Sequence, residues 1–225
     1  MPTARERVRA ELTAEITAAA RRQLAEVGAA ALSLRAVARE VGMASSAVYR
    51  YFPSRDDLLT RLIIDGYDAL GEAAEAADDP AAPPEQRWSA VCGAVRDWAL
   101  AHPHEYALLY GSPVPGYSAP QDTVPAASRV GIVLGRILGD AARAGRLSGG
   151  GVRVPGLLGD AAVEVLGQDA PGIDDAVRVR ALLAWSSLFG TVSFELFGHL
   201  VGSVEDADAY FARAVAELGA LIGLD

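Results

Sequence analysis

The sequence predicts an all-α protein, with a three-helix head at the N-terminus joined to a larger helical body. Apolar residues recur at three- and four-residue spacing along most of the chain, and stretches rich in glycine and proline separate these periodic segments. No segment alternates apolar and polar residues over a useful length, as a half-buried strand would. With 225 residues, the chain has room for two cores. We therefore predict a head over residues 1–55 and a body over residues 56–225.

The first predicted helix ends at Gly28 and carries its apolar residues on one face. Those residues are Ile16, Ala19, Ala20, Leu24 and Val27. Ahead of them lies the charged segment MPTARERVRAELTAE. Its residues Arg5, Arg7 and Arg9 have two interpretations, an arm that reaches phosphates or the minor groove, or a frayed and solvated terminus.

Residues 33–59 predict two short amphipathic helices joined by a glycine turn. Ser33 is a suitable N-cap for the first of them, which is expected to end near Val41. Gly42 can adopt the left-handed backbone that turns the chain sharply, and the second helix is expected to start near Ala44 or Ser45. A proline then ends the second helix, and a serine followed by two aspartates caps the next one. This arrangement is a helix-turn-helix, whose second helix enters the major groove of DNA.

The predicted DNA-contacting residues offer hydroxyl and guanidinium groups, which bind phosphates and base edges. We expect Tyr51 and Arg55 to lie near phosphates, and Ser46 and Arg50 to affect base preference. The full predicted set is Ser33, Arg35, Ser45, Ser46, Tyr49, Arg50, Tyr51 and Arg55.

The charge of the chain is divided unevenly between its two parts. Residues 1–55 hold nine arginines and five glutamates, a balance of +4, whereas the remainder has a balance of −13. Duplex DNA attracts a basic head and repels an acidic body, so the electric field orients the encounter. The net charge of −9 therefore does not exclude nucleic acid as a partner.

Twelve positions of this region follow the order and spacing of a known signature. They are Ser33, Val37, Ala38, Gly42, Val48, Tyr49, Tyr51, Phe52, Ser54, Asp56, Leu58 and Leu59. Over roughly residues 9–62 the chain resembles the TetR/AcrR family of bacterial one-component regulators, although Ala44 stands where serine usually caps the recognition helix and Arg55 stands where lysine is common. The resemblance implies a homodimeric repressor that binds a palindromic operator in double-stranded DNA and is released by a small-molecule effector.

The body begins with a long helix that carries Leu58 to Leu70 and is broken by acids and prolines near residue 78. Pro84 opens the next helix, and a break follows at His102 and Pro103. After a loop over residues 111–125, further helices are expected over residues 126–145, 154–168, 174–200 and 205–223.

The last two helices are the predicted pairing surface of the protein. Apolar residues lie on nearly every side of residues 177–201, and the final helix has a single apolar face. Family members pair their last two helices with those of a second subunit, and this pattern resembles that arrangement. We therefore expect a homodimer that places two recognition helices about 34 Å apart on the DNA. Residues 98–117 and 184–200 also resemble the WHG-type group, although Phe189 stands where that group's name implies histidine.

The family resemblance implies a ligand cavity inside the body, walled by bulky side chains. The candidates are Trp88, Trp98, Tyr106, Tyr110, Trp185, Phe189 and Phe194. Aromatic residues at helical spacing also suit a plain core, and the sequence leaves both interpretations open. Because His102 and His104 lack neighbours at metal-ligand spacing, we expect them to cap a helix end, and we expect no metal and no cofactor.

An enzyme is not expected, because the sequence holds no nucleophile elbow, phosphate-binding loop or metal-ligand spacing. Glu195 and His199 are interpreted as a local ion pair at i, i+4. The chain lacks an apolar signal segment or a membrane-spanning run, and its single cysteine suits a reducing compartment, so we expect a cytoplasmic protein. The alternative function is a DNA-binding dimer with no small-molecule ligand, regulated by a protein partner or by its abundance.

Overall fold

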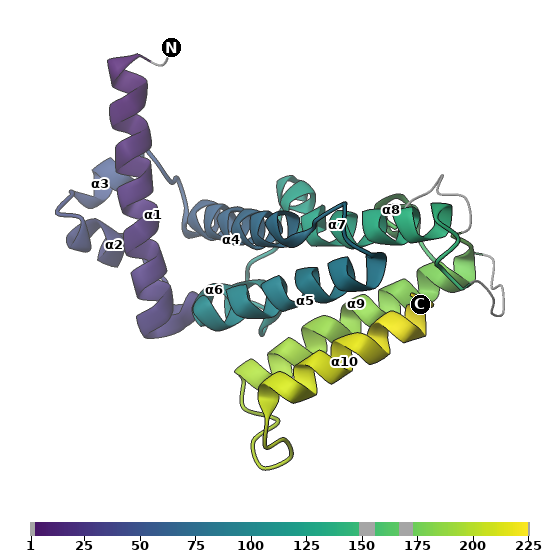
Figure 1. Cartoon of the computed structure of the whole chain (residues 1–225). Helices are drawn as coiled ribbons and strands as arrows, with labels where there is room; N and C mark the ends of the chain where they lie inside the picture. The colour runs from purple at the N-terminus through teal and green to yellow at the C-terminus, as the bar shows by residue number, and fades with distance from the viewer. Residues whose placement is uncertain (1–2, 149–155, 167–172, 225) are drawn as a thin grey trace. The chain divides into compact units, whose positions relative to one another are not determined.

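The computed structural model describes residues 3–148, 156–166 and 173–224, and the regular structure of these residues is helical. In that part of the chain, strand pairing is limited to one isolated bridge between Leu147 and Leu224, so the predicted all-α class is confirmed. None of the described helices combines the length and apolarity that crossing a membrane requires. The helices drawn in Figure 1 are α1 (Ala4–Ala31), α2 (Leu34–Glu40), α3 (Ser45–Val48), α4 (Arg55–Ala77), α5 (Pro84–Ala101), α6 (Pro103–Tyr110), η1 (Gln121–Thr123), α7 (Val124–Arg143), α8 (Asp160–Val165), α9 (Asp175–Leu196) and α10 (Ala207–Ile222).

The chain forms two compact units. The head unit contains residues 1–67 and 102–124, and the body unit contains residues 68–101 and 125–225. The long helix α4 therefore gives its first half to the head unit and its second half to the body unit. The boundary predicted between residues 55 and 56 separates the DNA-binding part of the chain from the ligand-binding and dimerisation part. This functional boundary stays a prediction.

The head unit is built around a core of buried apolar side chains from α1 to α4. Fully buried members include Ile16 of α1, Val37 of α2, Val48 of α3 and Leu58 of α4. Leu108, Val114 and Tyr117 pack against this core, which explains why residues 102–124 belong to the head unit although they lie far along the chain.

Helix α1 is longer at its start than the apolar pattern predicts. It begins at Ala4 and is closed by a capping box, in which Thr3 Oγ1 accepts from Glu6 N and the Glu6 carboxylate accepts from Thr3 N. The arginines of the N-terminal segment therefore lie in a formed helix and not in a frayed end, and their contact with phosphates or the minor groove stays a prediction. Gly28, the predicted end, has φ +74°, and one further turn follows it up to Ala31.

The body unit packs α5, α9 and α10 together. The indole Nε1 of Trp88 in α5 donates to the carbonyl of Val215 in α10 at 2.9 Å. A Cβ added at Gly219 would lie 3.3 Å from the Trp88 ring, so the small residue lets α10 approach this indole. Gly135 of α7 allows a still closer approach, because a Cβ added there would lie 2.3 Å from the carbonyl oxygen of Val165 in α8.

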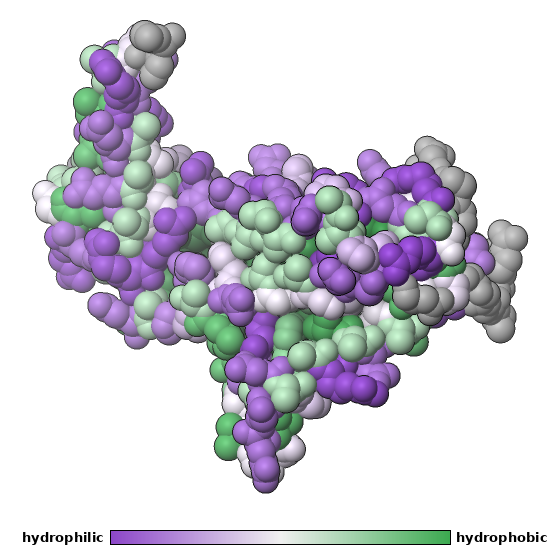
Figure 2. Space-filling model, in the orientation of Figure 1, coloured by the Kyte–Doolittle hydropathy of each residue, from purple (hydrophilic) through white to green (hydrophobic). Residues whose placement is uncertain are grey.

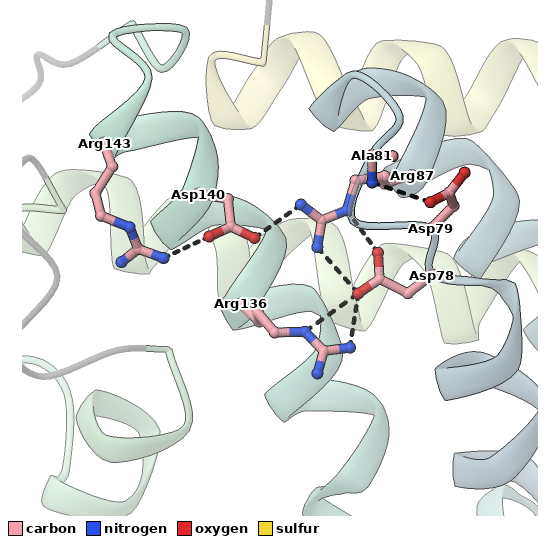
Figure 3. A network of polar contacts seen from close by, with 7 residues as sticks. All are labelled: Asp78, Asp79, Ala81, Arg87, Arg136, Asp140 and Arg143. Carbon is pink, nitrogen blue, oxygen red and sulfur yellow. Dashed lines mark hydrogen bonds and ion pairs between the residues drawn. The ribbon is translucent and has the colours of Figure 1, made fainter.

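A buried polar network joins the end of α4 to α5 and α7 in the body unit (Figure 3). The Asp78 side chain is fully buried and accepts from Arg87 Nε at 2.6 Å and from Arg87 Nη2 at 3.0 Å. Arg136 binds the same carboxylate at 2.6 Å, and Arg87 also donates to Asp140 at 2.8 Å. This network holds the loop that follows α4 against its neighbours.

Candidate nucleic-acid interface

The turn between α2 and α3 has the geometry that the sequence predicts. Gly42 adopts φ +67°, a conformation that costs an L-residue about 1–2 kcal/mol. The amide of Met43 donates to the carbonyl of Ala38 at 2.9 Å, and Gly42 N donates to Arg39 O at 3.3 Å. These two bonds form a Schellman motif, which ends α2 and redirects the chain into α3.

The starts of the neighbouring helices agree with the predictions only in part. Ser33 is the N-cap residue of α2, but its side chain makes no capping hydrogen bond, so the expected hydroxyl cap is wrong. Ser54 behaves as predicted, because its Oγ accepts from Asp57 N at 3.1 Å at the start of α4. Helix α3 starts at Ser45, as expected.

The predicted DNA-contacting side chains lie in the head unit, from the N-cap residue of α2 to the first residue of α4. Arg35, Ser46, Tyr49 and Arg50 are exposed, and Val48 between them is buried in the head core. The remaining members of the set are half-buried, namely Ser33, Ser45, Tyr51 and Arg55. The exposed subset presents one phenol, one hydroxyl and two guanidinium groups, all of which donate hydrogen bonds to phosphates or bases.

The arginines of the two units differ in their partners. Body-unit arginines such as Arg87, Arg96 and Arg129 each bind two carboxylate side chains. Within the first fifty residues, six exposed arginines have no carboxylate partner among the described residues. They are Arg5, Arg7, Arg9, Arg35, Arg39 and Arg50. Because unpaired guanidinium groups keep their charge available to phosphate, these six residues make the head unit a candidate DNA-binding surface.

Arg55 has a structural role that the sequence did not indicate. Its guanidinium donates to the carbonyls of Ala29, Ala30 and Leu32 at 2.8 to 3.2 Å, at the end of α1. These carbonyls lie at the end of α1, where helical N–H donors run out, although Ala29 O also accepts from Leu32 N at 3.4 Å. The arginine adds a donor for them and ties α1 to the start of α4. The phosphate contact of Arg55 stays a prediction, whereas its hydrogen bonds to the end of α1 give the same side chain a structural role.

Arg39 is exposed and unpaired but was not predicted, and Arg5, Arg7 and Arg9 were predicted only as one of two interpretations of the N-terminal segment. Nothing in their local sequence separates them from arginines such as Arg21, which binds Asp65 at 3.0 Å. Only the positions of acidic residues in the folded chain make this distinction.

Two of the predicted ligand-contacting residues belong to the head unit. Tyr106 is fully buried, and its ring centroid lies 5.1 Å from that of Tyr110. The ring of Tyr110 packs edge to face against that of Tyr67 in α4, with 5.9 Å between the ring centroids. Burial raises the pKa of the Tyr110 hydroxyl, which therefore stays protonated at neutral pH. These three tyrosines form an aromatic cluster around α6.

The other five predicted ligand-contacting residues belong to the body unit and occupy different environments. Trp88, Trp98 and Phe189 are buried, whereas Phe194 is 54% exposed. Trp185 is half-buried and lines a pocket of about 230 Å³ between α7, α8 and α9. The pocket is otherwise walled mainly by small and aliphatic side chains, namely Ala127, Ser128, Gly131, Ala161, Ala162, Val165, Leu166 and Leu182.

Two further interpretations made from the sequence are corrected by the structure. Glu195 pairs with Arg96 at 2.6 Å and not with His199, whose ring packs on Phe194. His102 is the N-cap residue of α6, but its side chain makes no capping hydrogen bond. Within the described residues, no cluster of three or more His, Cys, Asp and Glu side chains could hold a metal ion.

Comparisons with known proteins match both parts of the chain. Residues 16–62 match a family described as bacterial regulatory proteins, tetR family, and residues 88–218 match a tetracyclin repressor-like C-terminal domain. The HTH-type transcriptional regulator Rv1816 of Mycobacterium tuberculosis (strain ATCC 25618 / H37Rv) is 43% identical over 206 residues, which are 84% of this chain and 82% of that relative.

Solved structures also show the same fold. The regulatory protein SCO4313 is 36% identical, with a TM-score of 0.76 over 97% of this chain and 98% of that chain. The structure of RolR in complex with resorcinol has a TM-score of 0.56 and covers 97% of this chain and 96% of that one. It is 16% identical, so this likeness concerns the fold alone.

Proposed function

The chain belongs to the TetR family of helix-turn-helix transcriptional regulators, and from this premise we propose that it is a homodimeric repressor released from a palindromic operator by a small molecule. The family consists of regulators and not of enzymes, which confirms the expectation from the sequence that this protein is not an enzyme. The observation that carries the proposal is the group of six exposed arginines without a carboxylate partner in the head unit, which also holds the recognition helix α3. The narrower resemblance to the WHG-type group remains a prediction.

Operator recognition is assigned to α3 and the residues that flank it. Arg50 and Ser46 are proposed to contact base edges, and Arg35 is proposed to contact phosphates. A duplex enriched by the purified protein from a random pool supplies the operator for a binding titration. Arg50→Ala should weaken operator binding about 10- to 100-fold, because one good contact to a base supplies about 1–3 kcal/mol. Arg143→Ala, which removes an exposed arginine of α7, is the control and should leave the affinity unchanged.

The homodimer is proposed to form through α9 and α10. Large apolar side chains are exposed on both helices, with Leu183 51% exposed, Phe197 43% exposed and Leu221 44% exposed. In Figure 2, apolar side chains reach the surface near the turn between these two helices. A monomer rarely exposes a continuous apolar patch of this kind, and a second copy of the chain would cover it.

Light scattering of the eluting protein tests the dimer. Phe194→Glu should convert the protein to a monomer, because a charge would be buried at the proposed interface. Val27→Glu, an equally exposed apolar position on α1, should leave the mass unchanged. A wild-type protein that elutes as a monomer at micromolar concentration would show that the pairing is wrong.

Ligand response is proposed to travel along α4, because each half of this helix is held within a different unit. In the head unit, Asp65 binds Arg21 at 3.0 Å and Arg61 at 2.8 Å. In the body unit, Arg129 of α7 binds Asp68 at 2.9 Å and Glu75 at 2.7 Å. A change in the body unit that moves α7 would thus move the second half of α4, and the helix would transmit that movement.

Gly66 lies between the two groups of ion pairs and weakens the helix by about 1 kcal/mol relative to alanine. Release of the operator by a factor of a thousand requires about 4 kcal/mol of coupling between the two sites. The RolR complex with resorcinol supports the idea that a body of this fold can hold a small molecule.

Thermal shift against a metabolite library, followed by operator titration with each ligand that raises the melting temperature, tests the ligand response. If every such ligand leaves the operator affinity unchanged, the alternative function stands, in which the dimer has no small-molecule effector.

A further inference from the structure

The first turns of α1 extend the head unit beyond the region that matches the N-terminal family. Helix α1 begins at Ala4, and the family match begins at residue 16. These additional residues span about 18 Å at 1.5 Å per residue. Figure 1 shows this part of α1 continuing well past α2 and α3 within the head unit. The capping box formed by Thr3 and Glu6 closes the N-terminal end of this helix.

A groove of about 810 Å³ lies between this extension and the residues that follow α3. Two sets of residues border it, Thr3, Ala4, Arg5, Glu6, Val8 and Arg9 on α1, and Arg50 and Tyr51 after α3. We call it the α1 groove. The guanidinium of Arg9 lies 5.4 Å from the centroid of the Tyr51 ring, so a cation–π contact joins the two sides.

The α1 groove is cationic. Three of the six unpaired arginines border it, Arg5, Arg9 and Arg50, against the single carboxylate of Glu6. The Glu6 carboxylate accepts the backbone N–H of Thr3 at 2.6 Å, and this hydrogen bond lowers its pKa. One of its two oxygens, Oε2, is therefore engaged at the helix end, while the three guanidinium groups have no acidic partner among the described residues.

Arg7 provides an internal comparison on the same helix. Residues two positions apart on a helix are separated by about 200°, so Arg7 lies on the opposite side of α1 from Arg5 and Arg9. It does not border the α1 groove. All three arginines are exposed, and they differ mainly in the side of the helix that they occupy.

We propose that the α1 groove binds the phosphodiester backbone of duplex DNA beside the segment that α3 reads, with Arg5 and Arg9 as phosphate contacts. The inference rests on the proposed function of the head unit. A guanidinium binds phosphate through two parallel hydrogen bonds, and the groove is much larger than one phosphate, so it suits a continuous backbone. Tyr51 is a positioning residue in this assignment, because its ring holds the guanidinium of Arg9.

The dependence of DNA affinity on salt tests the proposal. Each phosphate contact contributes about 0.9 to the slope of log affinity against log salt. Because the proposed homodimer carries Arg5 and Arg9 twice, the double variant R5Q/R9Q of the full chain removes four phosphate contacts and should lower the slope by about 3.6, equally for the operator duplex and for random duplexes. Arg7→Gln, which removes the same charge from the other side of the helix, should leave the slope unchanged. Glutamine is as good a helix former as arginine, and circular dichroism verifies that α1 remains folded.

The role of Tyr51 is tested separately. Tyr51→Phe keeps an aromatic ring and should keep the wild-type slope, whereas Tyr51→Leu should lower the slope of the homodimer by about 1.8, as Arg9→Gln does. Combining Tyr51→Leu with Arg9→Gln should cause no further decrease. If Tyr51→Phe and Tyr51→Leu lower the slope equally, the positioning role is wrong, because the Tyr51 hydroxyl and not its ring would then support DNA binding.

The outcomes separate this inference from the proposed function. If the wild-type protein prefers no duplex, the proposed function fails. If it binds its operator and R5Q/R9Q has the same slope as the wild type, or if Arg7→Gln lowers the slope as much per charge, the α1 groove is not a phosphate site. A loss confined to the operator, absent with random duplexes, would identify base contacts and would also overturn the assignment.

Discussion

Arg87 is expected to be among the residues on which the stability of the body unit depends most. Its side chain is 2% exposed, and it binds the fully buried carboxylate of Asp78 through two hydrogen bonds (Figure 3). Arg87→Met keeps the apolar volume and removes the charge. The variant leaves the Asp78 carboxylate buried, with the half-exposed Arg136 as its remaining cationic partner. Removing one partner of a buried ion pair costs about 3–5 kcal/mol.

Urea denaturation followed by circular dichroism, at a fixed protein concentration because a dimer's stability depends on it, measures this loss. For a chain of this size, the same loss lowers the melting temperature by roughly 6–20 °C. The control is Arg146→Met, which removes a more exposed partner of Glu85 and should cost at most about 1 kcal/mol. If Arg87→Met costs no more than this control, the network does not stabilise the unit as argued.

The effect of Arg87→Met should depend on pH. Hydrogen bonds from Arg87 lower the pKa of Asp78 in the folded protein, against the effect of burial, which raises it. A carboxyl with a lowered folded-state pKa stabilises the fold above its unfolded pKa of about 3.9, and this stabilisation is lost as the pH falls through the folded value. Without Arg87, the Asp78 pKa rises and the buried carboxyl takes up a proton more readily. The difference between wild type and variant should therefore narrow as the pH falls from 7 to 4, and a constant difference would contradict the role of Asp78.

Four further outcomes are expected. Arg55→Ala should lower the unfolding free energy by about 1–3 kcal/mol in a denaturation experiment, because carbonyls at the end of α1 lose their donor, whereas Arg50→Ala should not change it. Gly42→Ala should cost about 1–2 kcal/mol and weaken operator binding in the same preparation, because alanine is strained at φ +67°. Gly135→Ala should cost about 1–3 kcal/mol in a thermal melt, since the new Cβ would lie 2.3 Å from the Val165 carbonyl oxygen. The Cys92 thiol should not react with Ellman's reagent at pH 8 until the protein unfolds, because burial raises its pKa, and rapid reaction of the native protein would contradict this.

Much of the head could be predicted from the sequence because its signals are local. A glycine that takes positive φ, as Gly42 does, ends one helix and starts a turn within a few residues. The helical spacing of Val37, Ala38 and Val48 identified side chains that the structure buries in one core. These features depend on neighbours along the chain, so pattern and structure agree.

Predictions about single side chains were less complete where their partners lie far along the chain. The Ser33 hydroxyl does not cap α2, and Glu195 binds Arg96, which is 99 residues away, instead of the nearby His199. Likewise, the predicted ligand-contacting aromatics are divided between two units, because residues 102–124 pack on the head core. Such packing depends on how distant segments meet.

The sequence by itself determined the helical class, the helix-turn-helix and the excess of positive charge in the first 55 residues, because periodicity, turn glycines and composition require no knowledge of distant contacts. Only the tertiary structure decided which arginines of this segment have no carboxylate partner and can bind phosphate. Arg55 is used by the carbonyls at the end of α1, while Arg5, Arg9 and Arg50 border an open groove. The physical reason is that a guanidinium donates its hydrogen bonds to whichever carboxylate or carbonyl the fold brings near it, and that neighbour is often far away in the chain.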